Sequence, residues 1–158
     1  MLSKLDDKIY YIGLKQSLFR IQGDEGLMRL WHYHLIPYLP RQQLLGQHRE
    51  CCALRGNGWG KKHATVNYVF EHDPHILWKY HVRVMDEMKC RGYNVDEQWA
   101  DSCYRGKSCE RYYSDVCLEQ YDYPEHNDEY FKECLANLVS KGIIIDEVNY
   151  RNTGEDLV

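Results

Sequence analysis

One candidate for chemistry is a carboxylate placed beside a cation. Glu50 directly follows Arg49, with Arg41 and Arg55 nearby in the sequence. A neighbouring cation favours the ionised form of a carboxylate, and a carboxylate held in place can manage protons at a sugar carbon. A solvated ion pair on a helix surface has the same residue types. The pair alone therefore leaves both interpretations open.

A second candidate is the glycine-rich basic loop Gly58-Trp59-Gly60-Lys61-Lys62-His63. Glycine lets a backbone approach a phosphate closely, and the two lysines supply positive charge. The indole of Trp59 could stack on a base exposed from a duplex. The loop is not a P-loop, because the spacing of its glycines and a Ser or Thr after lysine are missing. An ordinary turn with surface lysines is the alternative.

Metal and thiol chemistry are less well supported. Short spacings of possible ligands occur at His32-x-His34, at His72-x-x-His75 and among Cys103, Cys109 and Cys117. None has the paired spacings of a structural zinc site, and the Cys-x-x-Cys of a zinc deaminase is absent, so we predict no metal and no cofactor. Cys51 or Cys52 near His48 could act as a nucleophile, although buried helix cysteines are the more common case.

Periodicity and capping signals predict the elements that position these residues. We expect a helix over 40–55 that starts at Pro40 and ends at Gly56, and a second from Asp73-Pro74 to about Arg91, ended by Gly92. A third is expected over 127–141, with Gly142 as its stop. Ala64 to Phe70 and Ile143 to Ile145 favour short strands or extended segments, as does 9–14, while 22–26 predicts a loop.

The apolar positions of these helices predict which faces point inward. In the first helix they are Leu44, Leu45, His48, Cys51, Cys52 and Leu54. In the second they are Leu77, Tyr80, His81, Val84, Met85 and Met88. In the third they are Tyr130, Phe131, Cys134, Leu135, Leu138 and Val139.

Charge is distributed unevenly along the chain. The net charge of −4 divides into zero for residues 1–27, +5 for 28–91 and −9 for 92–158, and seven of the eight histidines lie in the middle block. A basic, histidine-rich core with an acidic tail is typical of a nucleic-acid surface, although a solvated basic face would have the same composition. No apolar run approaches the roughly 18 residues of a membrane span.

Residues 1–27 differ from the rest and are expected to be an extension of the core. Gln22-Gly23-Asp24 can be encoded by a purine run that resembles a bacterial ribosome-binding site, a few codons before Met28. We therefore interpret Met28 as a candidate natural start, with a genuine N-terminal extension as the alternative. The odd number of seven cysteines, without a secretory signal, favours reduced thiols and a cytoplasmic protein.

Several motifs together resemble the pyrimidine-dimer DNA glycosylase/AP lyase family typified by bacteriophage endonuclease V. The similarity is greatest to its bacterial members. The matching segments are Met28-Arg29-Leu30-Trp31-His32, Leu39 to Glu50, Gly58 to His63 and Met88 to Val95. The resemblance implies a mainly α, compact single domain over 28–158 with little or no sheet, whose acidic C-terminal part begins near residue 96.

The resemblance also implies a reaction. Family members attack C1′ of the damaged nucleotide with the α-amine of the chain terminus, which forms a Schiff base, and a glutamate then assists strand cleavage. These roles carry over to the amine of Met28 and to Glu50 with its neighbour Arg49. An α-amine suits the work, because its pKa near 7.8 leaves far more neutral amine at pH 7 than a lysine near 10.4.

The implied partner is double-stranded DNA that carries a damaged or abasic nucleotide, with that nucleotide extruded from the duplex. A family Gln-His pair corresponds here to Gln42-Gln43, so the histidine is replaced. The expected DNA contacts are Arg29, Arg41, Gln42, Gln43, Trp59, Lys61, Lys62 and His63. Two alternatives stay open, a non-enzymatic nucleic-acid-binding protein of the same fold and a metal-dependent nuclease.

Overall fold

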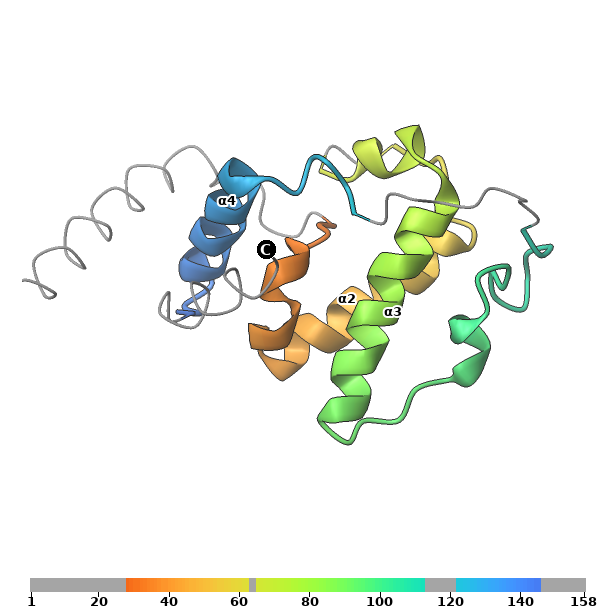
Figure 1. Cartoon of the computed structure of the whole chain (residues 1–158), viewed down its shortest axis with the longest axis horizontal. Helices are drawn as coiled ribbons and strands as arrows, with labels where there is room; N and C mark the ends of the chain where they lie inside the picture. Colours follow the sequence, from red (N-terminus) through yellow and green to blue (C-terminus); the bar gives the residue numbers. More distant parts are fainter. Residues whose placement is uncertain (1–27, 63–64, 113–121, 146–158) are drawn as a thin grey trace, which may run out of the picture. The chain divides into compact units, whose positions relative to one another are not determined.

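The structure, a computed structural model, describes residues 28–62, 65–112 and 122–145 (Figure 1). Along the chain these residues form η1 (Tyr33–Tyr38), α2 (Arg41–Arg55), η2 (Asn67–Glu71), α3 (Pro74–Cys90), η3 (Glu97–Ala100) and α4 (Asp128–Ser140), where η denotes a 3₁₀ helix. No strand occurs within the described ranges. The predicted mainly α fold is therefore confirmed.

Helix α2 has the bounds predicted from the proline and the glycine at its two ends. Pro40 stands at its N-cap, where the missing N–H costs nothing, and Gly56 stands at its C-cap. The Gly56 N–H donates to the Cys52 carbonyl at 3.0 Å. Its buried residues include two polar ones, Gln47 and Arg55, beside Leu44, Cys51 and Leu54. Periodicity did not predict either polar residue.

Helix α3 is also confirmed. The Asp73 carboxylate accepts the His75 N–H at 2.9 Å, and Pro74 occupies the first turn. Gly92 follows with a φ of +82°, a left-handed conformation that glycine adopts at little cost. All six residues predicted to face inward are buried: Leu77, Tyr80, His81, Val84, Met85 and Met88.

Two strand predictions are wrong for the residues that the structure describes. The second half of Ala64 to Phe70 belongs to η2, in which Val69 is buried; Val66, the N-cap residue three positions earlier, is buried too, which is the spacing of a 3₁₀ turn. Ile143 to Ile145 form no strand, and Ile144 is 66% exposed. Predictions for 9–14, for 22–26 and for His63 lie outside the described residues.

The chain divides into two compact units, of which one spans Leu27–Asn127. Within it α3 packs against α2, η1 and η2, and α2 and α3 lie side by side (Figure 1). This antiparallel layer holds the core that positions the candidate site. No described helix is long and apolar enough to cross a membrane.

The second unit contains α4, which confirms the helix predicted over 127–141. Gly142 follows the helix with a φ of +79°. Tyr130 and Val139, predicted to face inward, are only half-buried. The buried residues of α4 are Phe131, Cys134, Leu135, Ala136, Asn137 and Leu138.

His126 ties the end of the first unit to its beginning. Its Nδ1 accepts the Tyr33 N–H at 3.3 Å, and its Nε2 lies 2.7 Å from the Tyr68 hydroxyl. The His126 carbonyl accepts from His32 Nε2 at 2.9 Å. Burial, followed by the proximity of His32 and Arg83, lowers the pKa of His126 to about 3. The ring is therefore neutral at ordinary pH, with its proton on Nε2.

This neutral histidine predicts a loss of stability in acid. An unfolded histidine has a pKa near 6.5, so between pH 6.5 and 3 the unfolded chain binds a proton that the folded chain does not. The free energy of unfolding should fall by as much as about 1.4 kcal/mol per pH unit as the pH decreases through this window. Urea unfolding at pH 7, 6 and 5 measures the slope. His126→Gln should make the slope shallower while the contribution of His81, also a buried histidine of lowered pKa, remains, and an unchanged slope in that variant would contradict the assignment.

Candidate functional site

Gln47 joins the start of the first unit to Glu50. Its amide nitrogen donates to the Arg29 carbonyl at 3.1 Å and to Glu50 Oε2 at 2.9 Å. Its amide oxygen accepts the Trp31 N–H at 2.7 Å and lies 2.8 Å from the Tyr80 hydroxyl. Gln47 is 1% exposed, so these contacts are shielded from water. The arrangement fixes both the backbone of 29–31 and the carboxylate on α2.

The predicted catalytic residues lie around this junction. The Arg29 carbonyl and the Glu50 carboxylate share one nitrogen, which brings the backbone next to Met28 close to Glu50. The Met28 carbonyl accepts a hydrogen bond from the Thr65 hydroxyl. Arg49, the third member, is exposed on α2. The sequence offered one signal for Gln47, its spacing of three residues before Glu50 on a helix.

Met28 also borders an open cleft of about 550 Å³. One wall is the C-terminal end of α2 with the loop that follows it. The opposite wall is the segment after η3. The lining residues are Met28, Cys52, Ala53, Gly56, Asn57, Gly58, Lys61, Trp99, Arg105, Gly106 and Ser108.

Two glycines let this loop fold tightly against α2. A Cβ at Gly58 would lie 2.7 Å from the Ala53 carbonyl oxygen, and one at Gly56 would lie 3.0 Å from the Arg105 carbonyl oxygen. The Gly58 N–H donates to the Ala53 carbonyl at 2.8 Å. Gly60 adopts a φ of +79° and turns the chain toward Lys61. The glycines that suggested a phosphate loop thus have a structural role first.

A pair of glycine substitutions tests this packing. Gly58→Ala should destabilise the fold by about 1–3 kcal/mol, because backbone atoms must move to admit the methyl group. Gly46→Ala is the matched control, since its nearest neighbour is the Arg49 guanidinium at 3.8 Å within helix α2. It should stabilise the protein by about 0.5–1 kcal/mol. Urea unfolding of both variants measures the difference, and equal effects would contradict the close approach at Gly58.

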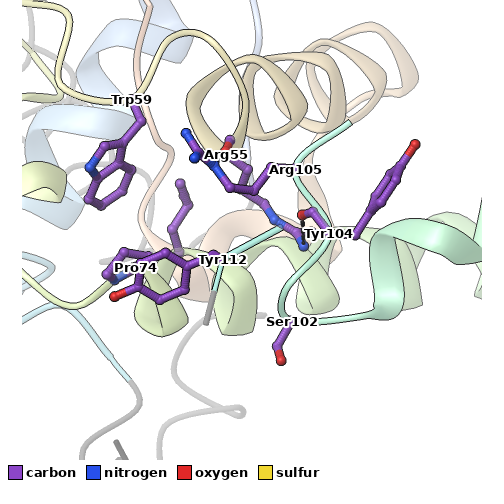
Figure 2. A pocket seen from close by; sticks show the side chains of 8 residues that line it. Arg55, Trp59, Pro74, Ser102, Tyr104, Arg105 and Tyr112 are labelled. Atoms are coloured by element: carbon purple, nitrogen blue, oxygen red, sulfur yellow. Dashed lines mark hydrogen bonds between the residues drawn. The ribbon is translucent and has the colours of Figure 1, made fainter. Parts of the chain in front are cut away.

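A smaller pocket of about 140 Å³ adjoins the cleft, and Arg105 lines both. Figure 2 shows Trp59 and Tyr112 on one side of this aromatic pocket, with Arg105 and Tyr104 on the other. Leu77 and Pro74 of α3 also line it. The Trp59 ring packs edge-on against Phe70, with centroids 5.0 Å apart. A cavity with aromatic walls and a guanidinium can accept a flat, polar-edged molecule.

Arg55 holds the far wall of the cleft in place. Its guanidinium donates to the carbonyls of Trp99, Asp101 and Tyr104 at 2.7, 2.8 and 2.9 Å, although the side chain is 5% exposed. Arg105, in the segment after η3, donates in turn to the carbonyls of Arg55 and Gly56 at 2.9 and 3.2 Å. These two arginines satisfy the carbonyl end of α2 and the loop packed against it.

His48, Cys52 and His81 form a group of metal-binding residue types, with one ligand atom from each within 4.8 Å of the others. His81 Nδ1 lies 2.9 Å from the Arg55 guanidinium, which can only donate, so His81 carries its proton on Nε2. That proton points at His48 Nδ1, 2.8 Å away. A metal bound to His81 Nε2 would displace this proton and leave Nδ1 facing a cation. The donor set therefore fits a hydrogen-bonded chain better than a metal site.

The pKa values of the side chains in this group and of Cys51 argue against a thiolate nucleophile. Burial raises the pKa of Cys52 to about 11 and raises that of Cys51 well above its ordinary value. Burial, with the charges of Arg49 and Arg55, lowers the pKa of His48, and burial lowers that of His81 strongly. The thiols stay protonated and the imidazoles neutral at pH 7. The cysteines that the structure describes carry free thiols.

The described residues of the other candidate metal spacings have other hydrogen-bond partners, and Cys117 lies outside the described residues. His32 Nδ1 accepts the His34 N–H at 3.2 Å, while His72 pairs with Glu125 and His75 with Asp73. The Cys109 thiol donates to Asn57 Oδ1 at 3.0 Å.

The predicted DNA contacts fall into two groups. Lys61 and Trp59 line the cleft and the aromatic pocket, and Lys62 is exposed beside them. Arg41, Gln42 and Gln43 stand at the opposite end of α2, about 20 Å away at 1.5 Å per residue. Arg41 lies over the Tyr93 ring, 5.4 Å from its centroid.

Arg29 differs from the rest of that set. It is only 5% exposed, whereas a side chain that contacts an external phosphate has to be accessible. Its role in DNA binding stays a prediction. Arg105, which no motif indicated, lies fifty residues beyond the carbonyl that it caps and was found only by the fold.

Comparison with known proteins shows which protein family this chain resembles. A family model described as pyrimidine dimer DNA glycosylase matches residues 28–101. This segment begins at Met28 and contains α2, the basic loop, α3 and η3. No curated protein and no solved structure gave a significant match. Through residues 28–101, this chain is similar to the pyrimidine dimer DNA glycosylase family.

Proposed function

We propose that the protein is a cytoplasmic DNA-repair enzyme that excises damaged pyrimidines, pyrimidine dimers above all, and then cleaves the strand as an AP lyase. The family match over residues 28–101 supports a DNA substrate and the glycosylase step. The observation that carries the lyase step is the Gln47 junction. It ties Glu50 to the backbone at the beginning of the matched segment, where a terminal amine would lie if the chain started at Met28.

The chemistry is a substitution followed by an elimination. The Met28 amine attacks C1′ of the damaged nucleotide, the bond from C1′ to the base breaks, and the base leaves with the bonding electrons. The resulting amine opens the sugar ring to an imine. Glu50 takes the proton from C2′, and the C3′–O bond breaks to release the phosphate. No metal or organic cofactor is needed for either step.

The cleft and the aromatic pocket supply places for the parts of the substrate. Lys61 and Lys62 offer charge to backbone phosphates without regard to sequence. The pocket of about 140 Å³ walled by Trp59 and Tyr112 offers aromatic and guanidinium groups to the base of a nucleotide turned out of the duplex. Extrusion costs a few kcal/mol and less where stacking is already damaged, so it favours lesions.

Borohydride trapping tests the proposal. A polypeptide that begins at Met28 is mixed with a duplex containing one abasic site, and borohydride reduces any imine to a stable secondary amine. We expect a covalent adduct whose mass maps to the terminal amine of Met28. A duplex without the abasic site is the control and should give none.

Two other results would point to different functions. Tight binding to the same duplex without any adduct or cleavage would indicate a non-enzymatic nucleic-acid-binding protein. Cleavage that disappears with a chelator and returns with zinc would indicate a metal-dependent nuclease. The Arg55 contact to His81 makes the second result unexpected.

A further inference from the structure

In the 158-residue chain the nitrogen of Met28 is a peptide nitrogen joined to Leu27. An amide cannot form an imine, so in this form of the chain another primary amine must take the place of the Met28 amine. We propose that Lys61 supplies that amine. The inference rests on the proposed function, since it concerns the same imine chemistry on the same DNA.

The position of Lys61 carries the inference. Lys61 and Met28 line the same cleft, and Lys61 is the one lysine among the described lining residues. The Lys61 N–H donates to the Gly58 carbonyl at 3.1 Å, and the left-handed turn at Gly60 precedes it. This turn leaves the side chain of Lys61 exposed and able to reach a sugar in the cleft.

The other polar groups of the cleft are poorer nucleophiles. The Cys52 thiol stays protonated because burial raises its pKa to about 11. Arg105 offers a guanidinium in place of a primary amine, and it donates to the carbonyls of Arg55 and Gly56. Lys62, the next residue, is exposed but does not line the cleft.

The step is balanced as for any amine lyase. Lys61 Nζ adds to the C1′ aldehyde of the open abasic sugar, and water leaves as the imine forms. A proton then leaves C2′ to a base, the C3′–O bond breaks, and the 3′ phosphate oxygen takes the electron pair. Added borohydride delivers hydride to the imine carbon and fixes the Nζ–C1′ bond.

The experiment uses the full chain from Met1 and a duplex with one abasic site. We expect a borohydride-dependent adduct, which digestion after glutamate and tandem mass spectrometry place on Lys61. Lys61→Arg keeps the positive charge but cannot form the imine, so its adduct should fall at least tenfold. Lys89→Arg is the matched control, an exposed lysine on α3 paired with Glu97, and should trap as the parent does.

The outcomes separate this inference from the proposed function. An adduct on another residue, or one retained in Lys61→Arg, overturns the role of Lys61. An adduct in the Met28-start form but none in the full chain overturns it too and leaves the proposed function standing. The absence of adducts in both forms would contradict both the role of Lys61 and the proposed function.

Discussion

Replacing Glu50 with glutamine in the Met28-start protein should lower strand cleavage at an abasic site by about 10²–10⁴-fold, while binding to the same duplex survives. The amide keeps the size of the side chain, and its oxygen can still accept from Gln47 Nε2. It cannot take the C2′ proton. Single-turnover cleavage and a gel-shift titration measure the two effects separately.

Glu71→Gln is the control for this experiment. Glu71 is an exposed glutamate at the end of η2 and does not line the cleft or the aromatic pocket. It removes the same charge from the protein, so an equal loss in both variants would indicate a general electrostatic effect. Near-normal cleavage by Glu50→Gln would refute the catalytic assignment of Glu50.

The largest expected effect on stability is at Arg55. Arg55→Met should lower the free energy of unfolding by about 3–5 kcal/mol, because it leaves buried partners of a charged group without their donor. The carbonyls of Trp99, Asp101 and Tyr104 and the Nδ1 of His81 all lose a hydrogen bond. Urea unfolding measures the change.

Arg111→Met provides the comparison. The Arg111 guanidinium pairs with Asp101 at 2.5 Å, but both side chains are more than 40% exposed. A pair of this kind contributes about 0–1 kcal/mol. If Arg55→Met proved as mild as Arg111→Met, the network of arginine-to-carbonyl bonds would not hold the cleft wall.

The sequence predicted elements where the signals are local. Pro40 and Gly56 mark the ends of α2, and Asp73-Pro74 and Gly92 mark those of α3, because capping depends on neighbouring residues. The strand expected near Val66 failed because β-branched residues spaced by three also fit a 3₁₀ turn. Periodicity could not separate these structures over so short a stretch.

The site was predictable in part for the same reason. Motif resemblance indicated Met28, Glu50 and the basic loop. Gln47 and Arg55 were missed because a polar residue on a buried helix face has no distinct periodicity. Apart from Glu50, which is three residues from Gln47, the partners named above are 16 to 49 residues away in the sequence, and only the folded chain brings them together. Arg105 was missed for that reason too.

Arg105 forms a shared wall between the cleft and the aromatic pocket. A phosphate that draws this guanidinium into the cleft would alter the wall met by a nucleotide in the pocket, and the reverse is equally true. Occupancy of the two spaces is then thermodynamically linked, with the same coupling free energy in each direction. An enzyme with this coupling would recognise the lesion and the DNA backbone together. A duplex that occupies only the cleft or only the aromatic pocket would therefore dissociate quickly.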